Sequence, residues 1–179
     1  MTATDEPQAP APDTKDWTWV LERPCPDCGF DARTVDVRGI GAAVRADVPR
    51  WQAVLARPDA RRRPAPGVWS PTEYAAHVRD VLDVFSGRVR LVLDEDDPLF
   101  PNWDQDATAL AERYDLQHPD DVARALARRA ATTAALFDAV PDDAWERPGR
   151  RSNGSVFTLA TLGAYFLHDV RHHLHDVRG

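Results

Sequence analysis

The stretch WSPTEYAAHVRDV, residues 69–81, decides the fold because it starts a long amphipathic helix. Ser70 can cap the helix N-terminus, Pro71 suits the first helical position, and Glu73 completes a capping box. Apolar residues then recur at helical spacing up to an acidic run that would end the helix. We therefore predict a helix over about 70–93.

Three more long helices are predicted on either side of this one. Apolar residues at spacings of three and four predict helices over about 35–55 and 157–177. A further helix begins near Pro119 and ends at Val140, just before another proline. Because strand-like alternation is nearly absent, we predict an all-α domain, a four-helix bundle.

The connections between these helices are unequal in length. Residues 94–118, about 25 residues, separate the second helix from the third, whereas packed helix pairs usually need about 2–8. A connection of this length can cross the whole bundle and leave the two helices parallel. It should also hold a short helix over 106–114, which could form a lid or a pocket wall.

Composition argues against nucleic-acid-binding and membrane-spanning proteins. The 179 residues include 22 basic and 29 acidic side chains, a net charge of −7. This acidic balance argues against nucleic acid as a partner, and no apolar run is long enough to span a membrane. The N-terminus carries no signal-peptide pattern, so we expect a cytoplasmic protein that acts on a small-molecule substrate.

The chain is predicted to contain one folded domain with an N-terminal extension. Residues 1–16 are rich in proline, alanine and acidic residues and are predicted to be a disordered tail. Residues 17–33 form an irregular extension that carries CPDCGF. The bundle domain itself is expected over 34–179.

Histidines cluster in the second and fourth predicted helices. At 100° per residue, His77 lies on the apolar face of its helix, where an unpaired imidazole would be costly. Asp169 and His173 are four residues apart, at the edge of the apolar stripe of the last helix, whereas His168 and His172 point away from it. His77, Asp169 and His173 are therefore the metal ligands that helix phase favours. Two histidines and one carboxylate leave coordination positions open for water or substrate.

These motifs resemble those of the DinB/YfiT-like metal-binding four-helix bundles. The resemblance rests on WSPTEYAAHVRDV and HDVRHHLHDV and covers about residues 34–178. It implies an up-down-down-up bundle in which the second helix carries one metal ligand. The fourth helix then carries two, four residues apart. Antiparallel packing of those helices would bring all three ligands together.

The resemblance also implies a chemistry. The position four residues before the last ligand is usually histidine, but it is a carboxylate in the mycothiol-dependent maleylpyruvate isomerase branch, and Asp169 stands there. This departure leaves a second register open, His77 with His168 and His172. The branch implies a divalent metal, zinc or nickel, and a thiol S-transferase-like enzyme. It would act on a small electrophile with mycothiol or another low-molecular-weight thiol.

Two other functions stay open at this point. One is a metallohydrolase of small amides or esters, which would use a metal-activated water. The other is a non-enzymatic, stress-associated protein that binds a metal. No catalytic residue beyond the metal ligands is assigned.

The pair Cys25 and Cys28 lies before the bundle, in CPDCGF. The first interpretation is a tight turn with two packed thiols. A zinc knuckle completed by remote or partner-chain ligands is the second, and a reversible disulfide is the third. Neighbouring prolines and Gly29 favour a turn over an activating helix N-terminus, so we expect neither cysteine to be catalytic.

Two helices carry features that suit a homodimer. The helix over 35–55 is apolar beyond a single stripe, and an alanine-rich run at 123–135 would let another helix approach closely. Closed two-fold dimers are the commonest oligomers of soluble proteins. We therefore predict that two copies of the chain associate through these helices.

Overall fold

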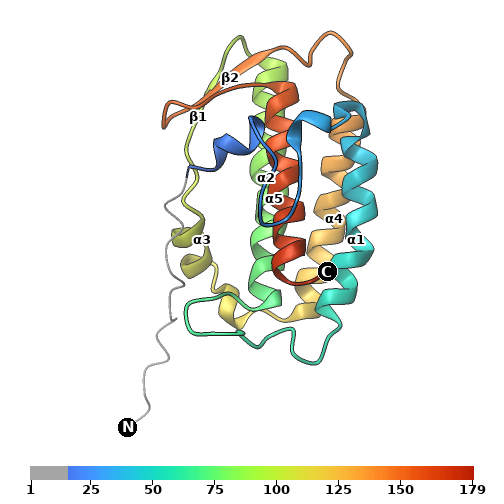
Figure 1. Ribbon diagram of the computed structural model, residues 1–179, viewed down its shortest axis with the longest axis vertical. Coiled ribbons are helices and arrows are strands. Elements are labelled where there is room, and N and C mark those ends of the chain that lie inside the picture. Colours follow the sequence, from blue (N-terminus) through green and yellow to red (C-terminus); the bar gives the residue numbers. More distant parts are fainter. Residues whose placement is uncertain (1–15) are drawn as a thin grey trace.

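A computed structural model describes residues 16–179 and shows the four-helix bundle (Figure 1). The predicted disordered tail therefore lies almost wholly outside the described residues. The long helices are α1 (Ile40–Leu55), α2 (Pro71–Asp94), α4 (Pro119–Asp138) and α5 (Leu159–Asp176). The predicted all-α bundle is confirmed. Of the described helices, none has the length and apolar character needed to cross a membrane.

The helices run in the up-down-down-up order. In Figure 1, α1 and α5 run in one direction, whereas α2 and α4 run in the other. The parallel arrangement of α2 and α4 is possible because the connection over 95–118 returns along the whole length of the bundle. As a result α2 and α5 are antiparallel neighbours, and the start of α2 lies beside the end of α5.

This long connection contains β1 (Leu99–Phe100), α3 (Gln105–Ala111) and a 3-10 turn (Tyr114–Leu116). The predicted short helix is present but ends earlier than expected. Arg113 has a positive φ of 48°, which breaks the helical path before the 3-10 turn begins.

The N-terminus of α2 has the capping box that its sequence predicts. The Ser70 hydroxyl accepts the Glu73 N–H at 3.3 Å, and the Glu73 carboxylate accepts the Ser70 N–H at 2.8 Å. Arg63 also pairs with Glu73. These bonds hold the start of α2 one turn before His77, so the position of this histidine is well defined.

A small sheet, which sequence alternation did not reveal, closes one end of the bundle. It contains β1, β2 (Pro148–Arg151) and β3 (Val156–Thr158), with β1 parallel to β2 and β2 antiparallel to β3. Strands of two to four residues are too short to show a period of two. The sheet lies where α2 ends and α5 begins (Figure 1).

The N-terminal extension forms three 3-10 turns: Trp17–Leu21, Ala32–Thr34 and Val37–Gly39. The last of these replaces the first turn of the predicted helix over 35–55, because Asp36 caps a 3-10 turn instead. The first two turns pack against α5, so the loop between them lies over that helix (Figure 1).

The surfaces expected to form a homodimer are largely used inside one chain. On α1 the apolar residues are buried in the common core: Ile40, Val44, Trp51, Val54 and Leu55. On α4, Ala130 and Ala134 are buried as well, and the carbonyl oxygen of Ala134 lies close to Gly41 of α1. The homodimer stays a prediction.

Candidate metal centre

Antiparallel packing of α2 and α5 brings His77, Asp169 and His173 together. The distance from His77 Nε2 to Asp169 Oδ1 is 3.4 Å, and that from His173 Nε2 to the same oxygen is 3.6 Å. One potential ligand atom from each of the three residues lies within 4.8 Å of the others. The three side chains therefore converge on a single point between the helices.

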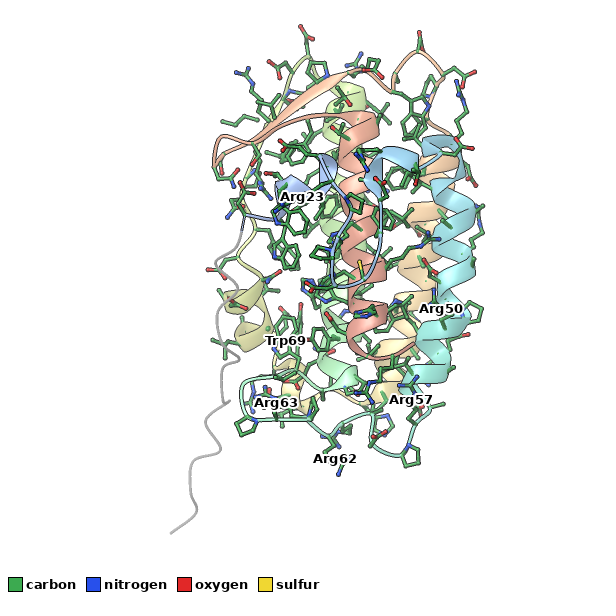
Figure 2. All side chains as sticks on the ribbon, in the orientation of Figure 1. Arg23, Arg50, Arg57, Arg62, Arg63 and Trp69 are labelled. Atoms are coloured by element: carbon green, nitrogen blue, oxygen red, sulfur yellow. The ribbon has the colours of Figure 1, made fainter. Side chains whose placement is uncertain are left out.

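His77 is fully buried and lies between two indole rings. The centroids of Trp69 and Trp103 are each 5.4 Å from that of His77, and Trp69 lies near the start of α2 (Figure 2). Within residues 16–179, neither nitrogen of His77 has a hydrogen-bond partner, nor does Asp169 Oδ1. A buried polar atom without a partner costs about 1–3 kcal/mol. A cation at this point would satisfy both residues, so the residues present fit a metal ion.

Burial and charge set the protonation states that metal ligands need. Burial lowers the pKa of His77, so its imidazole is neutral at pH 7 and offers a lone pair. Burial alone would raise the pKa of Asp169, but the adjacent imidazole of His77 and those of His173 and His168 hold it below its ordinary value. The site therefore offers a neutral imidazole beside an ionised carboxylate.

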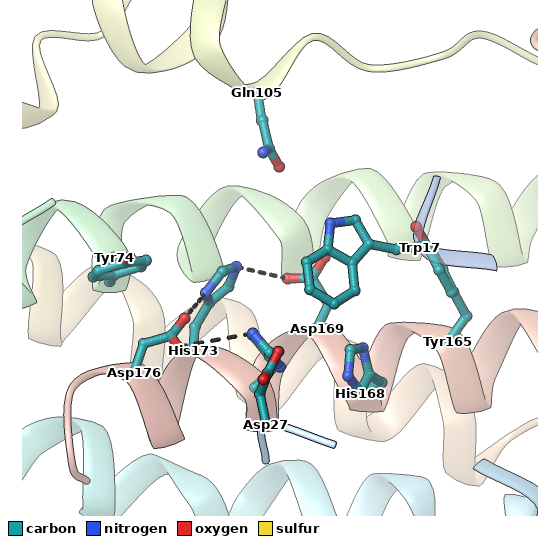
Figure 3. A pocket seen from close by; sticks show the side chains of 10 residues that line it. Trp17, Asp27, Tyr74, Gln105, Tyr165, His168, Asp169, His173 and Asp176 are labelled. Carbon is teal, nitrogen blue, oxygen red and sulfur yellow. Dashed lines mark hydrogen bonds and ion pairs between the residues drawn. The ribbon is translucent and has the colours of Figure 1, made fainter. Parts of the chain in front are cut away.

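Asp176 orients His173 (Figure 3). Its carboxylate lies 2.8 Å from His173 Nδ1. Because a carboxylate only accepts hydrogen bonds, Nδ1 carries the proton and Nε2 presents its lone pair towards Asp169. A carboxylate behind a histidine ligand is a common feature of metal sites, since it fixes the ring and raises its basicity.

A cavity of about 300 Å³ opens onto one side of this cluster. Asp169 and His173 line it, whereas His77 lies behind them, beneath Trp103. Gln105 of α3 points into the cavity from the opposite wall (Figure 3). The crossover connection thus supplies a wall of the pocket, and a cation bound by the cluster would have an open coordination position facing it.

The other histidine pair, His168 and His172, belongs to a different place. Both side chains face the N-terminal extension, where they lie beside Cys25 and Cys28. The ligand atoms of these four residues form a group separate from that around His77. The geometry therefore favours the first register of the ligand set, and the metal-binding role of these residues stays a prediction.

Two buried arginines lie near the pocket. Arg88 and Arg151 are 7% and 9% exposed. Burial, together with the charge of Arg151, lowers the pKa of Arg88 to about 10. In the described part of the chain, the only carboxylate within 4.0 Å of either guanidinium is that of the exposed Asp16, beside Arg151. Arg151 lies over the ring of Tyr165, a pocket-lining residue.

Comparisons with known proteins identify the family and the fold. The family model of the DinB superfamily matches residues 40–177. A solved structure, YfiT from Bacillus subtilis, is similar with a TM-score of 0.66 and 18% identity over 82% of this chain and 85% of that chain. It is described as a probable metal-dependent hydrolase with an unusual four-helix bundle topology. No curated protein matches the sequence. At this identity the likeness to YfiT shows the fold alone.

Proposed function

Since this chain belongs to the DinB superfamily, we propose that it is a divalent-metal-dependent enzyme of the thiol S-transferase type. His77, Asp169 and His173 would hold the cation. A low-molecular-weight thiol such as mycothiol would provide the nucleophile and a small electrophile would accept it. The observation that carries this proposal is a cluster of three potential ligands beside an open pocket, in which buried atoms of His77 and Asp169 have no hydrogen-bond partner among the described residues.

The charge of the ligand set favours an anionic nucleophile. Two neutral imidazoles and one carboxylate would leave a divalent cation with a net charge of +1. The cation supplies a lowered pKa for a thiol or water that it binds, so that this group is ionised at neutral pH. Other residues of the chain hold the ligands in place: Asp176 fixes the ring of His173, and Trp103 shields His77 from water.

Two buried arginines behind the pocket-lining Tyr165 indicate the class of electrophile. Arg88 and Arg151 place two cations behind Tyr165 without an adequate counter-charge from the described residues. The positive charge of these arginines would attract a carboxylate-bearing substrate towards Tyr165, with its reactive carbon nearer to the metal. We therefore include a small organic acid with an electrophilic carbon in the proposal.

Thiol dependence is the test of this function. Metal-loaded protein should consume an electrophilic organic acid such as maleylpyruvate with mycothiol, and not in its absence. His173→Ala should abolish this turnover. His175→Ala, which removes an exposed histidine from the same helix, should leave it unchanged. Equal turnover with and without thiol would contradict the transferase.

The electrophile's charge can be tested separately. Arg151→Gln should raise KM for the acid several-fold and leave KM for its neutral ester unchanged, because only the acid interacts with the guanidinium. An equal change in both values would contradict an anion-binding role for Arg151.

A hydrolase is the second candidate. Two histidines and a carboxylate also bind zinc in many hydrolases, where a water takes the open position. The description of YfiT as a probable metal-dependent hydrolase favours this alternative. Turnover of small amides or esters by the metal-loaded protein without any thiol would support it. Metal binding without either activity would favour a non-enzymatic role.

A further inference from the structure

The two cysteines of the extension and two histidines of α5 lie together where the extension packs on that helix. One potential ligand atom from each of Cys25, Cys28, His168 and His172 lies within 4.8 Å of the others. Cys25 Sγ is 3.6 Å from His172 Nδ1. In a tetrahedral zinc site, bond lengths of about 2.3 Å to sulfur and 2.0 Å to nitrogen separate the ligand atoms by about 3.3–3.8 Å.

We propose that these four residues bind a structural zinc ion that fastens the N-terminal extension to α5. The spacing agrees with this role, because the cysteines are separated by two residues and the histidines by three, as in Cys₂His₂ sites. This site is separate from the cluster around His77 and does not depend on the function proposed above.

The local backbone holds the cysteines in position for such a site. The Gly29 N–H donates to the Cys25 carbonyl at 2.9 Å, and the Cys25 N–H donates to the Phe30 carbonyl at 2.8 Å. Gly29 has a φ of +74°, a conformation that residues with a Cβ rarely adopt. This tight turn places both sulfurs on the side that faces α5, and both are free thiols.

The histidines are equally constrained. His168 and His172 lie one turn apart on α5, and they are 3% and 9% exposed. Within residues 16–179, His168 Nε2 is a buried nitrogen without a hydrogen-bond partner. The second nitrogen of His172, Nε2, lies 3.7 Å from Asp176 Oδ1, a carboxylate placed to orient the ring. The group therefore offers four potential metal-ligand atoms, and Asp176 orients the ring of one of its histidines.

Charge and coordination distinguish this site from the one around His77. Two thiolates balance one Zn²⁺ and both imidazoles are neutral, so the complex has no net charge and can be buried at low cost. Four protein ligands also complete the tetrahedral shell, which is typical of structural zinc. The cluster around His77 offers three ligands and so leaves a coordination position open. Both clusters border the same cavity, because His168 and His172 line it together with Asp169 and His173.

The zinc would hold a wall of that pocket. Trp17 packs against the histidines, with ring centroids 5.0 Å from His172 and 5.8 Å from His168. Trp17, which precedes the turn, and Asp27, which lies within it, both line the cavity. Fixing the turn to α5 therefore fixes these two side chains over the candidate metal centre.

Cobalt substitution provides the first test, since Co²⁺ bound to thiolates absorbs in the near ultraviolet through charge transfer. Full-length wild-type protein loaded with Co²⁺ should show this band together with a tetrahedral visible spectrum. Wild-type protein that binds Co²⁺ without the thiolate band would overturn the proposal. This measurement requires no variant to fold.

Metal content measured in matched variants provides the second test. Cys25→Ser/Cys28→Ser should bind one zinc fewer per chain than wild type and lose the cobalt band. His77→Ala/His173→Ala should keep the band, whether or not it loses a metal of its own. His175→Ala, next to the cluster but exposed, should match wild type. An unchanged zinc content in the cysteine variant would overturn the proposal, as would a native Cys25–Cys28 disulfide found by mass spectrometry.

Hydrogen exchange provides the third test. Amides over 20–34 should exchange at least ten-fold faster after chelation of the wild type and in the cysteine variant. They should keep their protection in His77→Ala/His173→Ala. Exchange over 20–34 that does not respond to zinc would contradict a structural role for the ion.

Discussion

His172 and His173 are adjacent in the sequence, yet their imidazoles belong to two different clusters. The ring planes are inclined at 81°, and the centroids are 5.8 Å apart. His172 Nδ1 faces the Cys25 sulfur, whereas His173 Nε2 faces the Asp169 carboxylate. Because successive residues of a helix are rotated by 100°, one His-His pair can serve both sides of α5. The Asp176 carboxylate lies behind both rings.

Asp176→Asn should weaken metal binding by the cluster around His77. The amide cannot hold the His173 ring as firmly as the carboxylate does, and loss of such a partner typically costs about 10–100-fold in metal affinity. Competition with a chromophoric chelator would measure the change, using zinc as the metal. Asp143→Asn, at an exposed loop position, is the matched control and should bind zinc like the wild type. Unchanged affinity in Asp176→Asn would contradict the orienting role.

Asp80→Asn should destabilise the fold in a pH-dependent way. Three side chains donate hydrogen bonds to the Asp80 carboxylate: Arg79, Tyr114 and Arg129. Burial alone would raise the pKa of Asp80, but these bonds and the Arg79 charge hold it below its ordinary value. The ionised carboxylate therefore contributes stability above the unfolded pKa of about 3.9, and this contribution is lost as pH falls through the lower folded pKa.

At pH 7 we expect Asp80→Asn to lower the free energy of unfolding by about 1–3 kcal/mol, measured by urea denaturation. The difference from wild type should shrink below about pH 4. Asp83→Asn is the matched control, because its more exposed carboxylate pairs with the same Arg129 and should cost less than about 1 kcal/mol. An equal loss in Asp80→Asn at pH 7 and pH 3 would contradict the linkage.

Gly41→Ala should destabilise the bundle although alanine favours helices. An added Cβ would lie 2.7 Å from the carbonyl oxygen of Ala134 and still closer to the Asp138 carboxylate. The expected overpacking cost of about 1–3 kcal/mol exceeds the helix-propensity gain of about 1 kcal/mol. Gly87→Ala, inside α2 with no described atom of its surroundings within 4 Å, should instead gain about 0.5–1 kcal/mol. Thermal unfolding of both variants would show opposite shifts in Tm if the close approach of α1 and α4 matters.

The predicted homodimer can be checked by sedimentation at micromolar concentration. A single species of 20.0 kDa would contradict it, since a dimer has twice that mass. Ala131 and Ala135 are exposed on α4. Ala135→Arg should therefore split a dimer formed through this face without unfolding the monomer.

The amino-acid sequence by itself determined the helices and the phase of their side chains. Capping and apolar spacing are local properties, so Ser70 and Glu73 marked the start of α2 correctly. The helical period also placed Asp169 and His173 on one side of α5 and His168 with His172 on another. These relationships depend only on residues a few positions apart.

Only the tertiary structure decided which distant residues these side chains contact and which of them are buried. Cys25 and His172 are 147 positions apart, and only the packing of the extension on α5 shows that a histidine pair lies beside the CPDCGF turn. In the same way, Arg88 looks like an ordinary helical arginine until the fold buries it near Arg151. Burial and long-range proximity arise from how whole elements pack, and no local pattern encodes them.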